Sequence, residues 1–444
     1  MHKPIRGIIL LVIILVGGLS CFLWDYAIHG KHWALHSANG RLYQGPNQRP
    51  SMGVVIDRRG EVLLQLSSEG SYAKDDGVRK GMLHWLGDRQ GNIYPGILHH
   101  YFSQMAGYSL RDGLYSYDSC GGVMQLTLSS AACKTALEAL GEYSGTIAVM
   151  NYHTGELLCA VSTPTFDAAQ GNPAEPVNGV YWNRFTQGVY VPGSIFKLVT
   201  TAAALEELPH ITRQQFTCYG EIILGNERIT CEMAHGTMDL KEAMMHSCNC
   251  AYAAISYQLG RERLLCYANG AEVLKPVCFD GITTAAGGLG PDLLGWSGIG
   301  QGMDQINPCA FLAFVAAIAR DGQGVEPYVV SSVERSGKCV YRACTKERER
   351  IMSCKTARKL TGYMRYNVDA KYGKEQFTPF CVCAKSGTAE VEGHRPNAMF
   401  VGFVQEEQYP LAFIVAVEDG GYGAKVCIPM IQRVLLACKN EMDL

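Results

Sequence analysis

The stretch that decides the fold is Val191-Pro-Gly-Ser194-Ile-Phe-Lys197-Leu-Val-Thr200. The Pro-Gly pair stops the preceding element, and serine is a residue type that favours the start of a helix. We therefore predict a helix from Ile195 to Leu208 that begins directly after Ser194. Ser194 and Lys197 are three positions apart, so their side chains would share one face of that helix.

This pair is a candidate nucleophile and base. A serine hydroxyl is a poor nucleophile until a base takes its proton, and a lysine can do so only when it is neutral. Apolar Phe196 and Leu198 predict that Lys197 is desolvated, and the first turn of a helix disfavours a cation. The same pattern also occurs at ordinary helix starts that carry a solvated lysine, so the interpretation needs partners elsewhere in the chain.

Length and charge limit the classes of function. The chain has 444 residues, which is enough for two or three domains and a large core. Lys plus Arg (39) nearly balances Asp plus Glu (41), so no overall positive field indicates binding to nucleic acid. We expect no nucleic-acid partner.

The first segment predicts the compartment. Lys3 and Arg6 precede the uncharged run Gly7–Trp24, which is just long enough to cross a bilayer with its positive end inside. A cleaved signal peptide is the alternative, but no small-x-small site follows the run. We expect a single-pass cell-membrane protein, in which residues 1–27 form a cytoplasmic tip and an anchor, residues 7–24 contact the lipid bilayer, and the rest is extracytoplasmic.

The chain contains 18 cysteines, a high number. No C-x2-C pair recurs at zinc-ribbon spacing, so we expect small buried thiols and no structural zinc. Cys218 and Cys231 stand at the two ends of a predicted small hairpin. In an exported protein they form either a disulfide or two free thiols, and the sequence leaves both open.

The chain after the anchor divides into two predicted parts. Residues 28–118 are polar and weakly periodic, which predicts a small, extended non-catalytic module or stalk with a hairpin near 52–64. Residues 119–444 place strands at both ends and helices between, which is typical of an α+β domain. Its antiparallel five-stranded sheet would combine a hairpin at 145–162 with strands near 380–390, 398–404 and 411–418. The charged segment 334–350 is expected to be mobile.

Three short motifs complete the pattern. They are Ser194-x-x-Lys197, Ser247-x-Asn249 and Lys385-Ser386-Gly387-Thr388. In this order, and behind an export anchor, they form the motif set of penicillin-binding proteins and serine β-lactamases. The chain therefore resembles the penicillin-binding protein transpeptidases over roughly residues 120–444, and the hairpin near 52–64 is similar to the N-terminal module of the monofunctional class B members.

The resemblance implies a peptidoglycan D,D-transpeptidase that β-lactams inhibit by forming a covalent acyl-enzyme. Ser194 would attack the carbonyl between the two terminal D-alanines of a stem peptide, and Lys197 would take its proton. Ser247 would pass a proton to the departing amine, and Asn249 would hold a substrate amide and help to fix Lys197. Lys385 would place positive charge near the substrate carboxylate.

The resemblance also assigns the substrate strand. Ser386 and Thr388 would bind the substrate carboxylate, and Gly387 would leave the strand edge open for the substrate backbone. The backbone N–H groups of Ser194 and Thr388 would form the oxyanion hole. No metal or cofactor is required. The implied partner is a membrane glycosyltransferase, commonly a multi-span SEDS-type polymerase of the elongation, division or sporulation pathway.

Other functions are weighed on the same residues. A class A β-lactamase needs a glutamate in an E-x-x-L-N segment, and none stands between Asn249 and Lys385. A D,D-carboxypeptidase differs only in letting water replace the acceptor amine, so this alternative stays open. A non-catalytic penicillin-binding scaffold is the alternative from a different class, although every expected motif side chain is present.

Overall fold

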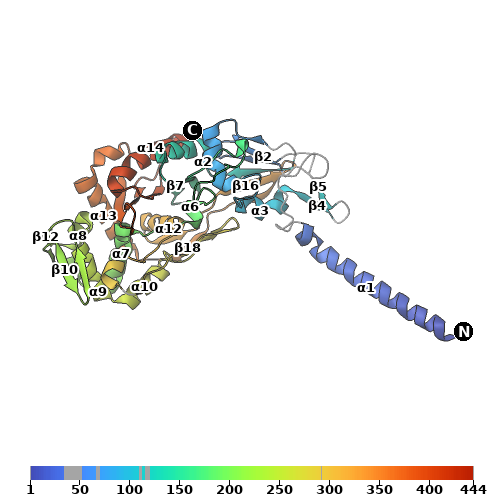
Figure 1. Ribbon diagram of the computed structural model, residues 1–444, viewed down its shortest axis with the longest axis horizontal. Helices are drawn as coiled ribbons and strands as arrows, with labels where there is room; N and C mark the ends of the chain where they lie inside the picture. Colours follow the sequence, from blue (N-terminus) through green and yellow to red (C-terminus); the bar gives the residue numbers. More distant parts are fainter. Residues whose placement is uncertain are drawn as a thin grey trace.

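The computed structural model describes residues 2–34, 53–66, 71–109, 113–115, 121–291 and 293–443. Helix α1 (His2–Ala34) extends away from the packed body of the molecule (Figure 1). Within α1, Ile5–Gly30 is long and apolar enough to cross a membrane, and its most apolar window is not buried against the protein. The predicted run at 7–24 lies inside this span, and the helix continues beyond the expected end of the anchor.

The centre of the body is a five-stranded antiparallel sheet, as predicted. Its order is β19-β20-β21-β7-β8. The strands are β19 (Val382–Ala389), β20 (Asn397–Val404), β21 (Leu411–Val417), β7 (Gly145–Asn151) and β8 (Leu157–Thr163). The central strands are continuous apolar runs because both faces of the sheet are buried under helices.

Two groups of helices cover this sheet. Helices α5 (Ser130–Leu140) and α14 (Gly423–Asp443) pack on each other and against β8 and β20. On the opposite face, α12 (Pro308–Ala319) contacts β21, and α13 (Cys354–Asn367) contacts β19. The α+β class is therefore confirmed, with the sheet as the middle layer.

A second sheet corrects one prediction. Its order is β17-β16-β6-β1-β2-β3. The strands are β17 (Lys338–Arg342), β16 (Val330–Arg335), β6 (Gly122–Leu126), β1 (Gly53–Ile56), β2 (Val62–Leu66) and β3 (Ser71–Tyr72). The segment 334–350, expected to be mobile, instead lies in β16, β17 and β18 (Glu347–Arg350). Its charged side chains are mostly exposed, whereas its backbone pairs with neighbouring strands.

The N-terminal module contains the predicted hairpin, formed by β1 and β2. It also contains helices that the sequence did not predict: α2 (Asp76–Leu86), α3 (Gly96–His100) and α4 (Phe102–Met105). Helix α2 begins because the Asp75 carboxylate accepts the backbone N–H of Val78. The indole N–H of buried Trp85 donates to the carbonyl of Ala160 on β8 at 2.7 Å, which ties the module to the central sheet. The division at residues 118 and 119 stays a prediction, since the second sheet takes strands from both sides.

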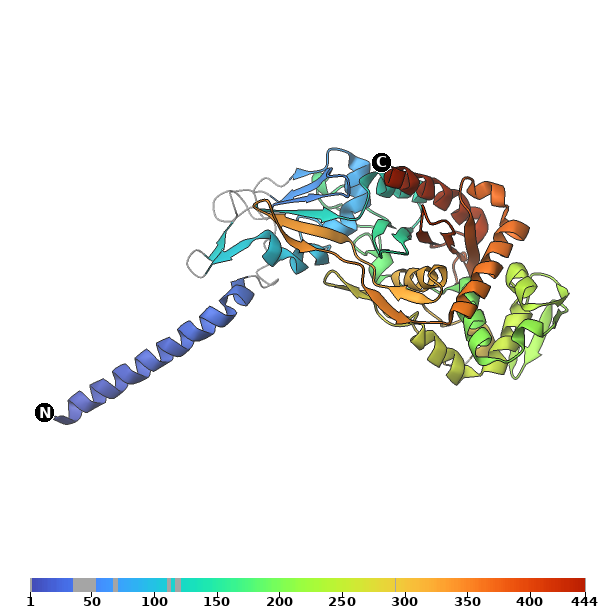
Figure 2. The same ribbon diagram turned by 180° about the vertical axis from the view of Figure 1, so that it is seen from behind.

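A separate lobe stands at the end of the body away from α1 (Figures 1 and 2). It holds the strand pairs β9 (Phe216–Cys218) with β12 (Gly236–Met238), and β10 (Glu221–Leu224) with β11 (Glu227–Thr230). It also holds α8 (Leu240–His246), α9 (Asn249–Leu259) and α10 (Arg261–Gly270). The predicted small hairpin is present as β10 and β11, and of the two alternatives for its ends, Cys218 and Cys231 are free thiols.

Candidate active site

Ser194 lies in a short 3-10 turn, η4 (Gly193–Ile195), that runs into helix α7 (Lys197–Glu207). The turn needs glycine at position 193, where φ is +54° and an added Cβ would come 2.8 Å from the carbonyl oxygen of Thr388. The turn therefore packs closely on strand β19. Ser194 is half-buried at this junction, whereas Lys197, at the start of α7, is completely buried.

The Lys197 amine is held by the second motif. Its Nζ donates to the Ser247 carbonyl oxygen at 2.6 Å and to the Asn249 amide oxygen at 2.8 Å, and it lies 3.2 Å from the Ser247 hydroxyl. Burial lowers the pKa of Lys197 to about 7. A neutral amine keeps two N–H donors, which the two short contacts match, and a lone pair that can accept a proton.

Ser247 occupies a strained position between two helices. It caps the C-terminus of α8 with left-handed backbone angles, φ 57° and ψ 39°, which cost a non-glycine residue about 1–2 kcal/mol. Asn249 opens α9, and its amide N–H donates to the Thr230 carbonyl at 2.7 Å, so its oxygen points to Lys197. The strain fits a functional position.

The third motif brings a second buried lysine to the same hydroxyl. Lys385 on β19 is 1% exposed, and its Nζ donates to the Ser247 hydroxyl at 3.1 Å and to the Ser386 carbonyl at 2.7 Å. Burial and the neighbouring Lys197 amine lower the pKa of Lys385 well below its ordinary value. We call Lys197, Ser247, Asn249 and Lys385 the amine cluster. Because the two amines share one hydroxyl, the cluster disfavours two positive charges at once.

The rest of β19 shows why the motif contains glycine. A Cβ on Gly387 would lie 2.9 Å from the Pro192 carbonyl oxygen and 3.0 Å from the Ile195 side chain. The missing side chain thus lets the strand approach the Ser194 turn. The predicted role of Gly387 toward the substrate backbone stays a prediction. The Thr388 hydroxyl accepts the Gly423 N–H at 3.2 Å.

A cleft of about 630 Å³ lies over these elements. Of the predicted residues it is lined by Ser194, Ser247, Asn249, Ser386 and Thr388. The two lysines lie behind this surface, bonded to Ser247. Within the described part of the chain the Lys197 amine makes no hydrogen bond to the Ser194 hydroxyl. Such catalytic contacts are often long in ligand-free proteins and shorten when substrate binds.

Sequence reasoning missed three residues around this cleft. The Tyr372 hydroxyl lies 2.9 Å from the Ser386 hydroxyl and accepts the Ser386 N–H at 2.9 Å. The Gln301 amide donates to the Thr388 carbonyl at 3.2 Å, and Lys371 lines the cleft. Gln301 stands in the glycine-rich stretch 287–302, a composition that favours a tight loop and so offers a signal for this residue. No local pattern marks Tyr372 or Lys371.

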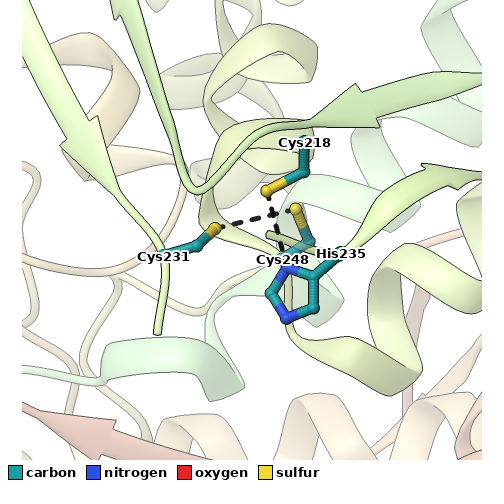
Figure 3. Close-up of side chains that lie close together, drawn as sticks. All are labelled: Cys218, Cys231, His235 and Cys248. Carbon is teal, nitrogen blue, oxygen red and sulfur yellow. Dashed lines mark hydrogen bonds between the residues drawn. The ribbon is translucent and has the colours of Figure 1, made fainter. Parts of the chain in front are cut away.

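A group of cysteine and histidine side chains lies close together in the lobe (Figure 3). It adjoins the amine cluster, because Cys248 stands between Ser247 and Asn249. One ligand atom from each of Cys218, Cys231, His235 and Cys248 lies within 4.8 Å of all the others. We call these four residues the thiol cluster. The absence of recurring C-x2-C spacing predicts no structural zinc, but these four residues come together from separate elements.

Comparisons with known proteins agree with this geometry. The model of the penicillin-binding protein transpeptidase domain matches residues 145–435, which is more than half of the chain. The chain belongs to the penicillin-binding protein transpeptidase family. The recognition made on the three motifs is therefore confirmed, and so is the expected fold of this family.

Individual relatives span most of the chain. Peptidoglycan D,D-transpeptidase PbpA of Mycolicibacterium smegmatis is 28% identical over 377 residues, which cover 76% of this chain and 77% of PbpA. Stage V sporulation protein D of Bacillus subtilis is 27% identical over 407 residues, covering 86% of this chain and 60% of the relative.

Solved structures share the fold. The penicillin G acyl-enzyme of penicillin-binding protein A from M. tuberculosis has a TM-score of 0.74 at 22% identity, and the match covers 88% of this chain and all of that one. A peptidoglycan synthase complex that coordinates polymerization and crosslinking contains a chain with a TM-score of 0.70 at 20% identity, with 98% of both chains covered.

Proposed function

We propose that this protein is a monofunctional, class B peptidoglycan D,D-transpeptidase that forms a serine acyl-enzyme and is inhibited by β-lactams. The observation that carries the proposal is the convergence of three distant motifs on one cleft, where burial lowers the pKa of Lys197, the lysine of the first motif, to about 7. The names of the relatives support the same reaction, since PbpA is a peptidoglycan D,D-transpeptidase.

Acylation begins at Ser194. Its Oγ forms a bond to the carbonyl carbon between the two terminal D-alanines, and its proton passes to the neutral Lys197 amine. The backbone N–H groups of Ser194 and Thr388 stabilise the negative oxygen that develops. The carbon–nitrogen bond then breaks, and the departing D-alanine amine takes a proton through the Ser247 hydroxyl, which contacts both lysines.

Substrate binding uses the open side of β19. The hydroxyls of Ser386 and Thr388 line the cleft and suit the terminal carboxylate of the stem peptide. Lys385 adds positive charge when it is protonated, and Asn249 also lines the cleft. The amine of a neighbouring stem peptide then attacks the acyl carbon, which releases Ser194 and completes the cross-link.

Labelling with a fluorescent penicillin tests the nucleophile. The wild-type chain becomes covalently labelled, and Ser194→Ala abolishes labelling because no oxygen remains to form the ester. Ser336→Ala, in an exposed turn between β16 and β17, is the matched control and keeps full labelling. Unchanged labelling of Ser194→Ala contradicts the assignment.

Labelling does not separate a transpeptidase from a D,D-carboxypeptidase. For this distinction, the chain is incubated with lipid-linked peptidoglycan polymer and the digested product is analysed by mass spectrometry. Dimeric stem peptides that disappear in Ser194→Ala support cross-linking. Release of D-alanine without dimers supports the carboxypeptidase.

The apolar span of α1 supports a single-pass anchor with the amino end in the cytoplasm and the catalytic domain outside. A transpeptidase placed in this way would work beside a membrane glycosyltransferase of the SEDS type. The structural likeness to a peptidoglycan synthase complex supports this partner. Protease digestion of intact spheroplasts tests the topology: the body should be digested, and a tag at residue 1 should be protected.

A further inference from the structure

The thiol cluster brings together four side chains from separate elements of the lobe (Figure 3). Cys218 ends strand β9, and Cys231 directly follows β11. His235 directly precedes β12, and Cys248 is the residue before α9. Cys218 and Cys248 are buried, whereas Cys231 and His235 are partly exposed at the wall of the cleft. A metal ion can therefore reach the cluster from the cleft.

The distances within the cluster fit a tetrahedral metal. With zinc–sulfur bonds of about 2.3 Å and zinc–nitrogen bonds of about 2.05 Å, tetrahedral angles place two sulfurs about 3.8 Å apart and a sulfur and a nitrogen about 3.6 Å apart. The Sγ atoms of Cys231 and Cys248 are 3.7 Å apart, and Cys218 Sγ lies 3.5 Å from His235 Nδ1. A disulfide needs about 2.05 Å between its sulfurs, so Cys231 and Cys248 do not form one.

Each of the three sulfurs also accepts backbone N–H groups. Cys218 accepts from Gly220 at 3.4 Å, Cys231 accepts from Asn249 at 3.1 Å, and Cys248 accepts from Ala251 at 3.5 Å. An N–H donor to a sulfur favours the thiolate, which is the form that binds metals. Thiols that serve only as apolar packing need neither these donors nor an imidazole.

We propose that Cys218, Cys231, His235 and Cys248 bind one Zn²⁺ ion. Three thiolates and one imidazole in tetrahedral array are a typical structural zinc set, and soft sulfur ligands select zinc over magnesium or calcium. Binding forms three zinc–sulfur bonds and one zinc–nitrogen bond and releases the thiol protons, with no change of oxidation state. The resulting complex carries a net charge of −1.

The position of the metal gives it a second role. Cys248 stands between Ser247 and Asn249, so a bond from Cys248 to zinc fixes the turn that holds the Lys197 amine. Cys231 adds to this because its sulfur accepts the Asn249 N–H. Zinc would thus position the amine cluster without contacting the substrate. This consequence rests on the proposed function, whereas metal binding does not.

Metal content tests the site directly. The full chain is purified in detergent under mild reduction, and zinc is measured by mass spectrometry against protein concentration. We expect about one zinc per chain, and a loss of at least fivefold in Cys218→Ser and His235→Ala. Two controls should keep the metal: Cys266→Ser, which is exposed in α10, and Cys250→Ala, whose sulfur lies 3.5 Å from Cys231 but is outside the group of four.

Cobalt substitution gives a readout that does not depend on how stable the variants are. Co²⁺ added to the zinc-free wild-type chain should give thiolate charge-transfer bands in the near ultraviolet and the intense visible bands of a tetrahedral site. A wild-type chain with less than a tenth of an equivalent of zinc and no such bands overturns the proposal. Zinc retained in both ligand variants, or lost in Cys250→Ala, overturns the assignment of these four ligands.

The positioning role has its own test. Removing zinc with a chelator should slow acylation by a fluorescent penicillin about 10- to 100-fold, the usual effect of losing a supporting contact at a site. Adding Zn²⁺ should restore the rate in wild type but not in Cys218→Ser. A bound zinc whose removal leaves acylation unchanged overturns the positioning role alone. A chain that binds zinc but never acylates with or without it points to failure of the proposed function.

Discussion

The amine cluster and the thiol cluster lie on two sides of one tripeptide, Ser247-Cys248-Asn249, and they satisfy their buried atoms differently. Ser247 and Asn249 bond to the lysine amines, whereas Cys248 lies against Cys231. In the amine cluster every member is a hydrogen-bond partner of another member. The contacts within the thiol cluster are made by sulfur, which is a weak donor and a weak acceptor. A metal bound by Cys248 would therefore act on the same turn that holds the Lys197 amine.

The largest expected effect comes from removing the base of the amine cluster. Lys197→Ala should lower the second-order rate of acylation about 10²- to 10⁴-fold, because Ser194 loses the group that takes its proton. Labelling with a fluorescent penicillin, quenched at successive times, measures this rate. Lys355→Ala, on the exposed face of α13, is the control and should keep the wild-type rate. A loss of less than threefold in Lys197→Ala contradicts the base assignment.

The second effect is a pH dependence that belongs to the same cluster. Because the pKa of Lys197 is lowered to about 7, its neutral fraction rises as the pH approaches 7 and levels off above it. Below pH 7, the acylation rate should therefore fall roughly tenfold for each pH unit.

Other titratable groups near Lys197 also have lowered pKa values, and a substitution of Lys385 distinguishes its titration from that of Lys197. Burial also lowers the pKa of Lys385, of Lys371 and of His246 at the cleft. Lys385→Arg places a permanent cation beside the Lys197 amine, so the inflection that belongs to Lys197 should move to lower pH, and the rate should be lower. A profile that rises only above pH 9 contradicts a neutral Lys197.

These two effects rest on features that the sequence predicted well. The strands of the central sheet are continuous apolar runs because both faces of the sheet are buried. Such runs can be recognised in the sequence without knowledge of distant contacts. The motifs at 194–197, 247–249 and 385–388 are short, but their order along the chain made them specific. What brings them together is the packing of β19 on the Ser194 turn, which needs glycine at 193 and 387.

Other parts were not predictable because their signals are not local. Strand β16 pairs with β6, which lies about 200 residues earlier, and its charged residues face solvent, so the segment looked mobile. The segment 28–118, which contains helix α2, is polar and weakly periodic in sequence. Its link to the central sheet, through Trp85 and Ala160 on β8, is visible only in the folded chain. The residues of the thiol cluster lie at the end of β9 and directly beside β11, β12 and α9, so no C-x2-C motif marks them.

The third effect tests the thiol cluster through folding stability. A ligand that binds only the folded chain at about 100 times its Kd stabilises it by about 2.7 kcal/mol. Because the shift in Tm scales inversely with the number of residues that unfold, saturating the zinc-free chain with Zn²⁺ should raise Tm by roughly 3 °C. Differential scanning calorimetry measures this shift, and Cys218→Ser should show none. An equal shift in Cys218→Ser would assign the stabilisation to zinc bound elsewhere.

The smallest effect concerns a contact at the edge of the amine cluster. The buried Tyr372 hydroxyl accepts the Ser386 N–H and lies 2.9 Å from the Ser386 hydroxyl, so Tyr372→Phe leaves two polar groups without this partner. One neutral hydrogen bond is worth about 1 kcal/mol, and we expect acylation to slow about fivefold. The ring still packs against Phe400, so Tm should change little. A rate equal to wild type would mean that Ser386 needs no orientation by the Tyr372 hydroxyl.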